Sequence, residues 1–175
     1  MCGISGELRF DGQQPNRDSM QAMLQKLERR GPDNEGVYFK GALALGHRRL
    51  AIIDLSEKSN QPMHDEKHGL SLVFNGTIYN YPALRKELQH FGHTFVSDGD
   101  SEVILKAYAE WGVGCLQRLH GMFAFALWDD KRQRLFVARD RMGIKPLYFS
   151  LDENRLLFAS TTPVSYTHLT LPTMQ

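Results

Sequence analysis

The chain begins Met1-Cys2-Gly3-Ile4-Ser5-Gly6, which places a cysteine directly after the initiator methionine and at the start of a predicted strand. An initiator methionine is commonly removed when the next side chain is small, as that of cysteine is. Removal would leave Cys2 with a thiol and a free α-amino group on one residue. A thiol needs a base to become a nucleophile, and an amine with an ordinary pKa of about 7.7–8.0 can serve as that base. Taken alone, a cysteine at this position is more often an accident than a nucleophile, so the rest of the chain must decide.

The hydrophobic pattern predicts an α+β fold. Apolar residues alternate with more polar ones from Ile4 to Phe10, which predicts the first strand. Helical spacing predicts three helices that begin near residues 16–18, 82 and 100; the first ends at Gly31-Pro32 and the third at Gly112. Further strands are predicted at 36–40, 42–54, 70–75, 122–128, 135–139, 147–150 and 156–160. The last four form two hairpins, so we expect antiparallel sheets covered by helices.

The composition is typical of a soluble globular protein with one domain. Of 175 residues, 42% are apolar and 23% charged, and the net charge is +1, so neither nucleic acid nor membrane is expected as a partner. No apolar run of about 18 residues and no signal peptide is recognised. Two cysteines in such a chain indicate a reduced, cytoplasmic protein, with Cys115 expected to be a small buried hydrophobic residue.

The sequence lacks the common catalytic motifs, which favours the hypothesis that Cys2 is the nucleophile. There is no glycine-rich phosphate loop, no HExxH metal motif and no GxSxG nucleophile elbow. His90 and His93 are three residues apart, but they lie on either side of Gly92 and match no metal motif. A metal or redox site built on Cys2, His90 and His93 is therefore the weakest hypothesis, and no metal or cofactor is expected in this chain.

A thiol nucleophile also needs hydrogen-bond donors for the oxygen that becomes negative in a tetrahedral intermediate. Asn75-Gly76 is a candidate, because the asparagine amide donates and glycine lets a backbone N–H approach a ligand closely. The same dipeptide is common in turns between strands, and on these grounds alone the turn is the better interpretation.

An amino-acid substrate would need a cation for its carboxylate and an anion for its ammonium group. Arg48 and Arg49 are neighbours in a predicted strand, so only one of them can face a site. Asp98, Asp100 and Glu102 could supply the anion. Acidic residues are also common at the beginning of a helix, where they complement the helix dipole.

Seven short motifs follow one another along the chain: Met1–Ile4, Arg30–Asp33, Gly46–Leu50, Asn75–Asn80, Asp100–Val103, Gly121–Ala126 and Ala138–Tyr148. Together they resemble the glutaminase domain of class II glutamine amidotransferases, in the asparagine synthase branch. The resemblance covers residues 2–160, and seven motifs in this order are specific although each alone is weak.

The resemblance implies an N-terminal-nucleophile hydrolase fold, which is a four-layer αββα sandwich of two antiparallel sheets between helices. It implies that Cys2, freed by removal of Met1, attacks the side-chain amide of L-glutamine. Ammonia leaves, a glutamyl thioester forms, and water then releases glutamate. Asn75 and Gly76 match the family's oxyanion hole. The residues that match its substrate pocket are Arg49 for the α-carboxylate, Asp100 for the α-ammonium group, and Leu50, Ile52, Asn75, Gly76 and Thr77.

The sequence departs from the family pattern at Thr77, where many relatives carry glutamate. A hydroxyl cannot pair with an ammonium ion as a carboxylate can, so substrate binding is expected to depend more on Asp100. Within the branch, residues 6–12 and 72–76 look most like the N-acetylglutaminylglutamine amidotransferase subgroup, with asparagine synthase as the second choice.

A larger departure follows residue 160. Full-length relatives continue there into a synthetase domain that needs ATP and Mg²⁺ and consumes the ammonia, whereas residues 161–175 are uncharged and aperiodic. We expect these residues to be a non-native or truncated tail, and the chain to hydrolyse glutamine at most. The main alternative is a non-catalytic amidotransferase-fold module, which retention of Met1 would favour. The acceptor of the ammonia and the oligomeric state, a homodimer included, stay open.

Overall fold

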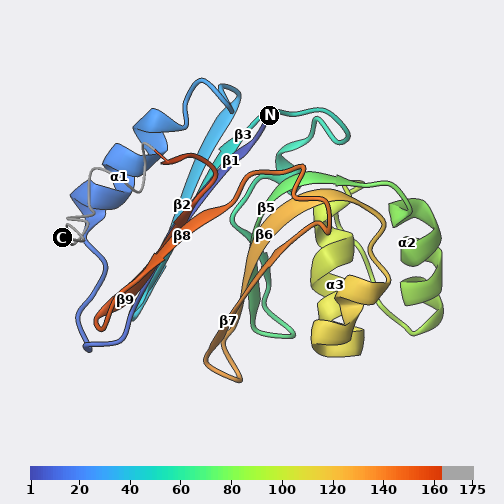
Figure 1. Cartoon of the computed structure of the whole chain (residues 1–175). Coiled ribbons are helices and arrows are strands. Elements are labelled where there is room, and N and C mark those ends of the chain that lie inside the picture. Colours follow the sequence, from blue (N-terminus) through green and yellow to red (C-terminus); the bar gives the residue numbers. More distant parts are fainter. Residues whose placement is uncertain (163–175) are drawn as a thin grey trace.

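A computed structural model describes residues 1–162 of the chain and contains two antiparallel β-sheets (Figure 1). Strands in the first sheet have the order β2-β3-β1-β9-β8, and strands in the second have the order β4-β5-β6-β7. The first sheet comprises β1 (Gly3–Arg9), β2 (Asn34–Lys40), β3 (Leu43–Arg49), β8 (Tyr148–Leu151) and β9 (Arg155–Ala159). The second comprises β4 (Met63–Asp65), β5 (Leu70–Ile78), β6 (Gly121–Asp129) and β7 (Arg134–Arg139). The helices are α1 (Arg17–Lys26), α2 (Tyr81–His90) and α3 (Ser101–Trp111), with short 3-10 helices η1 (Glu57–Ser59) and η2 (Gly112–Gln117).

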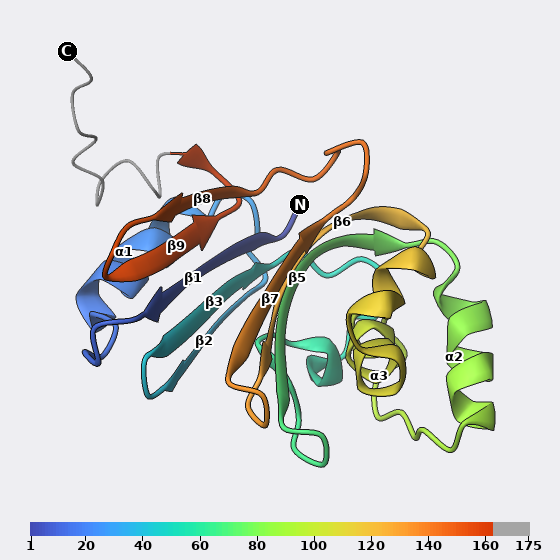
Figure 2. The ribbon, with the colours of Figure 1, turned by 60° about the horizontal axis from the view of Figure 1, so that its bottom comes forward.

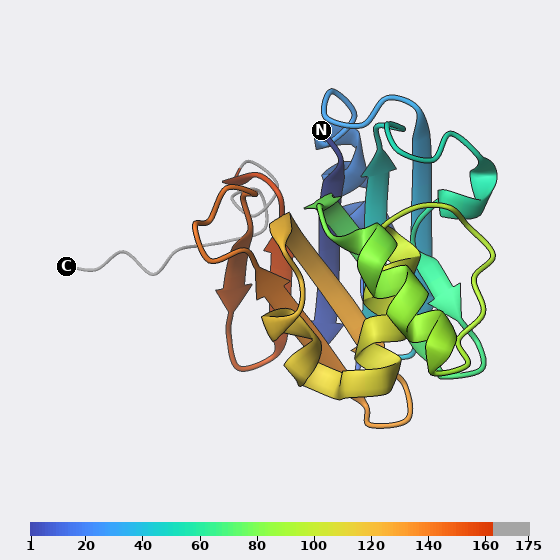
Figure 3. The ribbon, with the colours of Figure 1, turned by 90° about the vertical axis from the view of Figure 1, so that its right-hand side faces the viewer.

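Helices cover the outer faces of both sheets, which gives the molecule four layers (Figure 2). α1 packs against the first sheet through Met20 and Leu24, which contact Ala44 of β3. α2 and α3 lie against the second sheet (Figure 3), where Tyr108 of α3 and Phe125 of β6 belong to one buried cluster. The predicted αββα arrangement is confirmed. Within residues 1–162, no helix combines the length and the apolar character needed to cross a membrane.

A second buried cluster lies between the sheets and fixes how they face each other. It includes Ile4 of β1, Leu45 of β3, Val73 of β5 and Phe158 of β9, all with no exposed surface. Burial of one such side chain contributes about 1.5–3 kcal/mol. Because β1 pairs with both β3 and β9, this packing holds the start of β1, and with it Cys2, inside the first sheet rather than at its edge.

The first helix begins where its capping residue predicts. The side chain of Asn16 accepts a hydrogen bond from the backbone N–H of Ser19 at 2.9 Å, so Asn16 rather than Asp18 is the N-cap. The third helix ends at Trp111, and Gly112 follows in a left-handed conformation with φ of 57°.

The predicted strand 42–54 is wrong beyond Arg49, where β3 ends. The following backbone N–H groups donate to side chains instead of a neighbouring strand: Leu50 to Cys2 Sγ at 3.3 Å, Ala51 to Asp33 at 2.8 Å and Ser56 to Asp54 at 2.8 Å. These bonds hold residues 50–60 as a loop, which we call the 50–60 loop. The apolar pattern could not distinguish this loop from a strand, because both are rich in apolar residues.

The expected turn at Asn75-Gly76 is also wrong, because both residues lie inside β5. Asn75 is opposite Ala124 of β6, and Gly76 is opposite Phe123. A Cβ atom on Gly76 would lie 2.2 Å from the carbonyl oxygen of Met122, so only glycine allows β6 to approach this closely. The Asn-Gly pair therefore marks a close approach between two central strands, not a reversal of the chain.

Candidate active site

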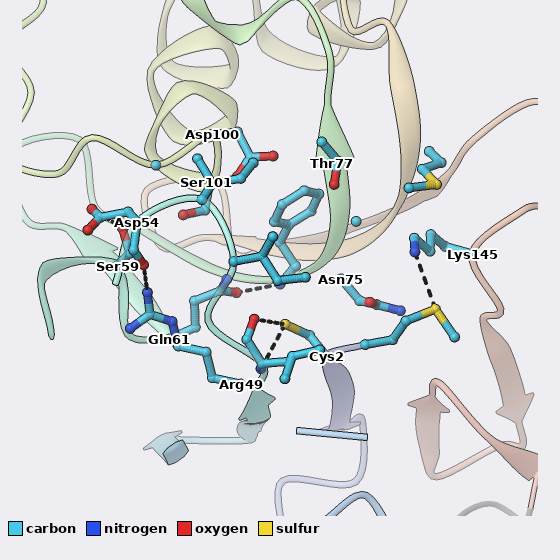
Figure 4. A pocket seen from close by; sticks show the side chains of 18 of the residues that line it. Cys2, Arg49, Asp54, Ser59, Gln61, Asn75, Thr77, Asp100, Ser101 and Lys145 are labelled. Atoms are coloured by element: carbon cyan, nitrogen blue, oxygen red, sulfur yellow. Dashed lines mark hydrogen bonds between the residues drawn. The ribbon is translucent and has the colours of Figure 1, made fainter. Parts of the chain in front are cut away.

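A cavity of about 500 Å³ is lined by residues from the beginning of β1, the end of β3 and the facing strand β5 of the second sheet (Figure 4). All of the residues predicted to form the site line it, although they are spread from position 2 to position 100. They are Cys2, Arg49, Leu50, Ile52, Asn75, Gly76, Thr77 and Asp100. The cavity is the size of a small-molecule site and combines apolar walls with a few polar groups.

Cys2 is half-buried beside the end of β3. Its Sγ accepts a hydrogen bond from the backbone N–H of Leu50 at 3.3 Å and donates to the Leu50 carbonyl oxygen at 3.6 Å. Burial is the largest influence on its pKa and raises it above that of a free thiol, while the Leu50 N–H and the Arg49 charge act in the opposite direction. The thiol is therefore protonated at neutral pH and needs a base before it can attack a substrate.

Asn75 presents a side-chain amide N–H group to the cavity. The residue is 1% exposed, and its Nδ2 has no hydrogen-bond partner within residues 1–162. A buried donor left unpaired costs about 1–3 kcal/mol, so such groups are rare outside functional sites. In Figure 4 the side chain lies between Cys2 and Lys145. An oxygen atom of a bound ligand would satisfy this donor.

A buried histidine holds β5 in place next to Asn75. His47 of β3 has no exposed surface, and its Nε2 donates to the carbonyl oxygen of Phe74 at 3.0 Å, across the space between the sheets. Burial lowers the pKa of His47 to about 4, so the imidazole is neutral at physiological pH. Its Nδ1 has no partner in the described part of the chain.

The two consecutive arginines face opposite sides of β3, as strand alternation requires. Arg48 points away from the cavity, where its Nε donates to the Leu24 carbonyl oxygen at 3.2 Å and Nη2 pairs with Glu35 at 2.5 Å. Arg49 lines the cavity and binds the 50–60 loop, donating to the Ser56 carbonyl oxygen at 2.8 Å and to Asn60 Oδ1 at 2.7 Å. A third bond goes to the carbonyl oxygen of Asp54. Arg49 thus both faces the cavity and holds one of its walls.

Asp100 and Thr77 lie on another side of the cavity, close to the beginning of α3 (Figure 4). Asp100 is 6% exposed, and its Oδ2 accepts the backbone N–H of Ile78 at 2.9 Å. Burial raises the pKa of this carboxyl group, while the Ile78 N–H lowers it. Asp100 is also the N-cap residue of α3, but its side chain makes no capping bond within the helix. The carboxylate therefore faces the cavity instead of the helix end.

Several cavity residues were not singled out from the sequence. Asp54 organises the 50–60 loop, because its carboxylate accepts from Ser59 Oγ at 2.6 Å and from the Asp98 N–H at 3.1 Å. These bonds hold its pKa well below the usual range, the Ser59 hydroxyl having the largest effect. Lys145 lies inside the last recognised motif, and nothing in its spacing indicated a place in the cavity. Other residues of this kind are Ser59, Gln61 and Ser101.

Arg30 supports Cys2 from outside the cavity lining. Its Nε donates to the carbonyl oxygen of Cys2 at 3.1 Å, which fixes the backbone at the start of β1. The second sequence motif contains this residue, but the motif alone indicates no role for it. Its Nη2 is buried without a partner among the described residues, and burial lowers the pKa of the guanidinium.

The alternative metal site is not assembled. His90 and His93 do not line the cavity that holds Cys2, and His93 Nε2 contacts Glu110 at 2.9 Å. Within residues 1–162, no group of three or more His, Cys, Asp or Glu side chains is arranged to hold a metal ion. Cys115 is fully buried, as predicted, and burial raises its pKa to about 11.

Two solved structures share the N-terminal-nucleophile fold predicted for this chain. The chain superposes on the glutamine phosphoribosylpyrophosphate amidotransferase of Bacillus subtilis with a TM-score of 0.77 and 22% identity, over 93% of this chain and 42% of that one. A second structure, an allosteric regulatory enzyme of purine biosynthesis, gives a TM-score of 0.75 at 21% identity. At this level of identity the likeness shows the fold alone.

The chain belongs to the glutamine amidotransferase domain family, which it matches over residues 1–173. It is 40% identical to glutamine-hydrolyzing asparagine synthetase 3 of Bacillus subtilis, over 96% of this chain and 28% of that protein. It is 39% identical to a putative glutamine-hydrolyzing asparagine synthetase 2 of Methanocaldococcus jannaschii, over 91% of this chain and 34% of that protein. The domain is thus a class II glutamine amidotransferase domain of the asparagine synthase family, as the motifs predicted. The finer assignment to the N-acetylglutaminylglutamine subgroup stays a prediction.

Proposed function

We propose that this chain hydrolyses L-glutamine to glutamate and ammonia, with Cys2 as an N-terminal nucleophile after removal of Met1. The observation that carries the proposal is the arrangement around one cavity of the Cys2 thiol, the unpartnered Asn75 amide, Arg49 and Asp100. These are a nucleophile, an oxyanion donor, and one charge of each sign for an amino-acid substrate. Membership of the glutamine amidotransferase family supports the same reaction.

In the proposed reaction the α-amine of Cys2 accepts the thiol proton, and Sγ attacks the side-chain carbonyl carbon of glutamine. The carbonyl oxygen becomes negative and is stabilised by the Asn75 amide and the Gly76 N–H. The amine then passes its proton to the amide nitrogen, the C–N bond breaks, and ammonia leaves. Water attacks the resulting thioester, which releases glutamate and restores the thiol.

The substrate's own charged groups would be held away from the reacting atoms. Arg49 is proposed to bind the α-carboxylate and Asp100 the α-ammonium group, with Leu50 and Ile52 as apolar contacts. Thr77 stands where many relatives have glutamate, so Asp100 would be the main anion for the ammonium group.

The ammonia would serve an ATP-dependent amidation in a C-terminal synthetase domain, which would bind ATP and Mg²⁺. The chain spans only 28–34% of the length of the two asparagine synthetases described above, which supports the proposal that ammonia is produced here and used in a separate C-terminal domain. A cytoplasmic location is proposed with it, because glutamine and ATP are both available there.

The test is glutamate release from L-glutamine by the purified chain and by Cys2→Ala and Cys2→Ser. Both substitutions should abolish release, and mass spectrometry of the active protein should show that Met1 is absent. A diazo-ketone analogue of glutamine should label the N-terminal residue. Cys115→Ser is the matched control and should keep its activity, because that thiol is fully buried away from the cavity. Undiminished glutamate release by Cys2→Ala would overturn the proposal.

A further inference from the structure

Lys145 is a buried cation that has no anionic partner within residues 1–162. It lies in the connection between β7 and β8, is 7% exposed, and lines the cavity. The partner of its Nζ is Met1 Sδ, at 3.4 Å. A thioether is a weak acceptor and carries no charge, and a buried charge without a counter-charge is costly. A negative charge inside the cavity would therefore stabilise the Lys145 ammonium.

The backbone around Lys145 is fixed from two sides, so its place in the cavity is built into the fold. Asp140 accepts the N–H of Lys145 at 3.0 Å and that of Ile144 at 2.8 Å. The same carboxylate accepts the Phe123 N–H of β6 at 3.1 Å. Arg139 Nε donates to the Lys145 carbonyl oxygen at 2.7 Å. Two charged side chains are thus used to hold one short segment against β6.

Lys145 lies at the end of the cavity where the proposed chemistry occurs. In Figure 4 it is on the side of Cys2 and Asn75, whereas Arg49 and Asp54 lie on the other side of Cys2. A substrate held by Arg49 and Asp100 would extend its amide towards Cys2. The negative charges expected near Lys145 are then the thiolate of Cys2 and the oxygen that forms when the amide is attacked.

We propose that, once Met1 has been removed, the Lys145 ammonium stabilises the negative charge that develops on Cys2 Sγ and on the oxygen bound by Asn75. Loss of Met1 removes the thioether from Nζ and leaves the ammonium facing the reacting end of the cavity. The same positive charge disfavours protonation of the new α-amine, which keeps that amine available as a base. This inference rests on the proposed function and adds a residue to its chemistry.

Other charged groups also influence the Cys2 thiol, so they must be left unchanged in every variant that is compared. Arg49 lowers and Asp100 raises the pKa of the thiol, and Arg30 contacts the Cys2 carbonyl oxygen. The charged groups that face this region are Arg30 before β2, Arg49 at the end of β3, Asp54 in the 50–60 loop, Asp100 before α3 and Lys145.

The experiment compares the wild-type chain with Lys145→Met and Lys145→Arg, each prepared with Cys2 as its first residue by cleavage of an N-terminal fusion. The rate of iodoacetamide labelling of the N-terminal peptide is measured by mass spectrometry between pH 6 and 10. It reports the fraction of Cys2 present as thiolate and needs no glutaminase activity. Initial rates of glutamate release give kcat and KM on the same samples. Lys86→Met, an exposed position on α2, is the matched control for loss of a lysine.

Lys145→Met should shift the labelling midpoint upward by about one pH unit, and kcat should fall about tenfold at pH 7. Lys145→Arg keeps the positive charge, so its labelling midpoint should stay close to that of the wild type. Lys86→Met should leave both the labelling midpoint and kcat unchanged. Lys145→Gln replaces the methionine variant if that protein does not fold.

An unchanged labelling midpoint in the neutral variant would overturn the inference, as would an equal shift in Lys145→Arg. A rise in KM alone would also overturn it, because Lys145 would then bind the substrate and not the developing charge. Failure of the proposed function would give a different result from failure of this inference, because Cys2→Ala would then still release glutamate.

Discussion

His47 should make the protein lose stability in mildly acidic solution. Its imidazole is fully buried between the sheets, and burial lowers its pKa to about 4, whereas in the unfolded chain the value returns to about 6.5. Between these values the unfolded state binds the proton and the folded state does not. The contribution of neutral His47 is therefore complete above pH 6.5 and is lost as the pH falls towards 4.

The size of the effect follows from the two pKa values. A difference of about 2.5 units corresponds to about 3 kcal/mol at 1.36 kcal/mol per unit. Between pH 7 and pH 5, His47 alone should lower the free energy of unfolding by about 2 kcal/mol. With a urea dependence of about 2 kcal/mol per molar, the unfolding midpoint should fall by about 1 M.

The assay is urea unfolding at pH 7, 6 and 5, followed by tryptophan fluorescence, for the wild-type chain and His47→Gln. Glutamine retains an amide donor for the Phe74 carbonyl oxygen but gains no proton in this range, so the fall in midpoint should shrink by about 1 M. Burial also lowers the pKa of His64, so His64→Gln is measured beside it to account for the remaining slope. An equal fall in midpoint in His47→Gln and wild type would refute this explanation.

Gly76→Ala should lower the free energy of unfolding by about 1–3 kcal/mol, because the added Cβ would lie 2.2 Å from the Met122 carbonyl oxygen. Gly114 has open space around it, so Gly114→Ala should change the free energy of unfolding by less than about 0.5 kcal/mol. Thermal unfolding of both variants checks this, and equal effects would contradict it. Asp54→Asn should raise KM for glutamine and lower stability by about 1 kcal/mol, because the carboxylate that holds the 50–60 loop loses its charge. Steady-state kinetics beside the exposed control Glu153→Gln test this, and an unchanged KM would show that the loop does not depend on the carboxylate.

The order of strands and helices was largely predictable, because alternation and helical spacing are local properties. The strand that begins beside Cys2, the cap of α1 and the end of α3 all depend on residues within a few positions of one another. The short strand β4 and the end of β3 were not predicted. Hydrogen bonds to distant side chains, such as the one that the Ala51 N–H donates to Asp33 Oδ2, decide where β3 ends, and no local pattern contains them.

The sequence by itself determined which chemistry the chain offers: a cysteine that can become N-terminal, an Asn-Gly pair, and arginines and acids for an amino acid. Only the tertiary structure decided how these groups meet. Asn75 lies in β5, inside the second sheet, where its Nδ2 is buried without a partner among residues 1–162. Lys145 enters the cavity because Asp140 and Arg139 hold its backbone. The physical reason is that residue type fixes charge and reactivity, whereas contact between residues far apart in the chain depends on how two sheets pack.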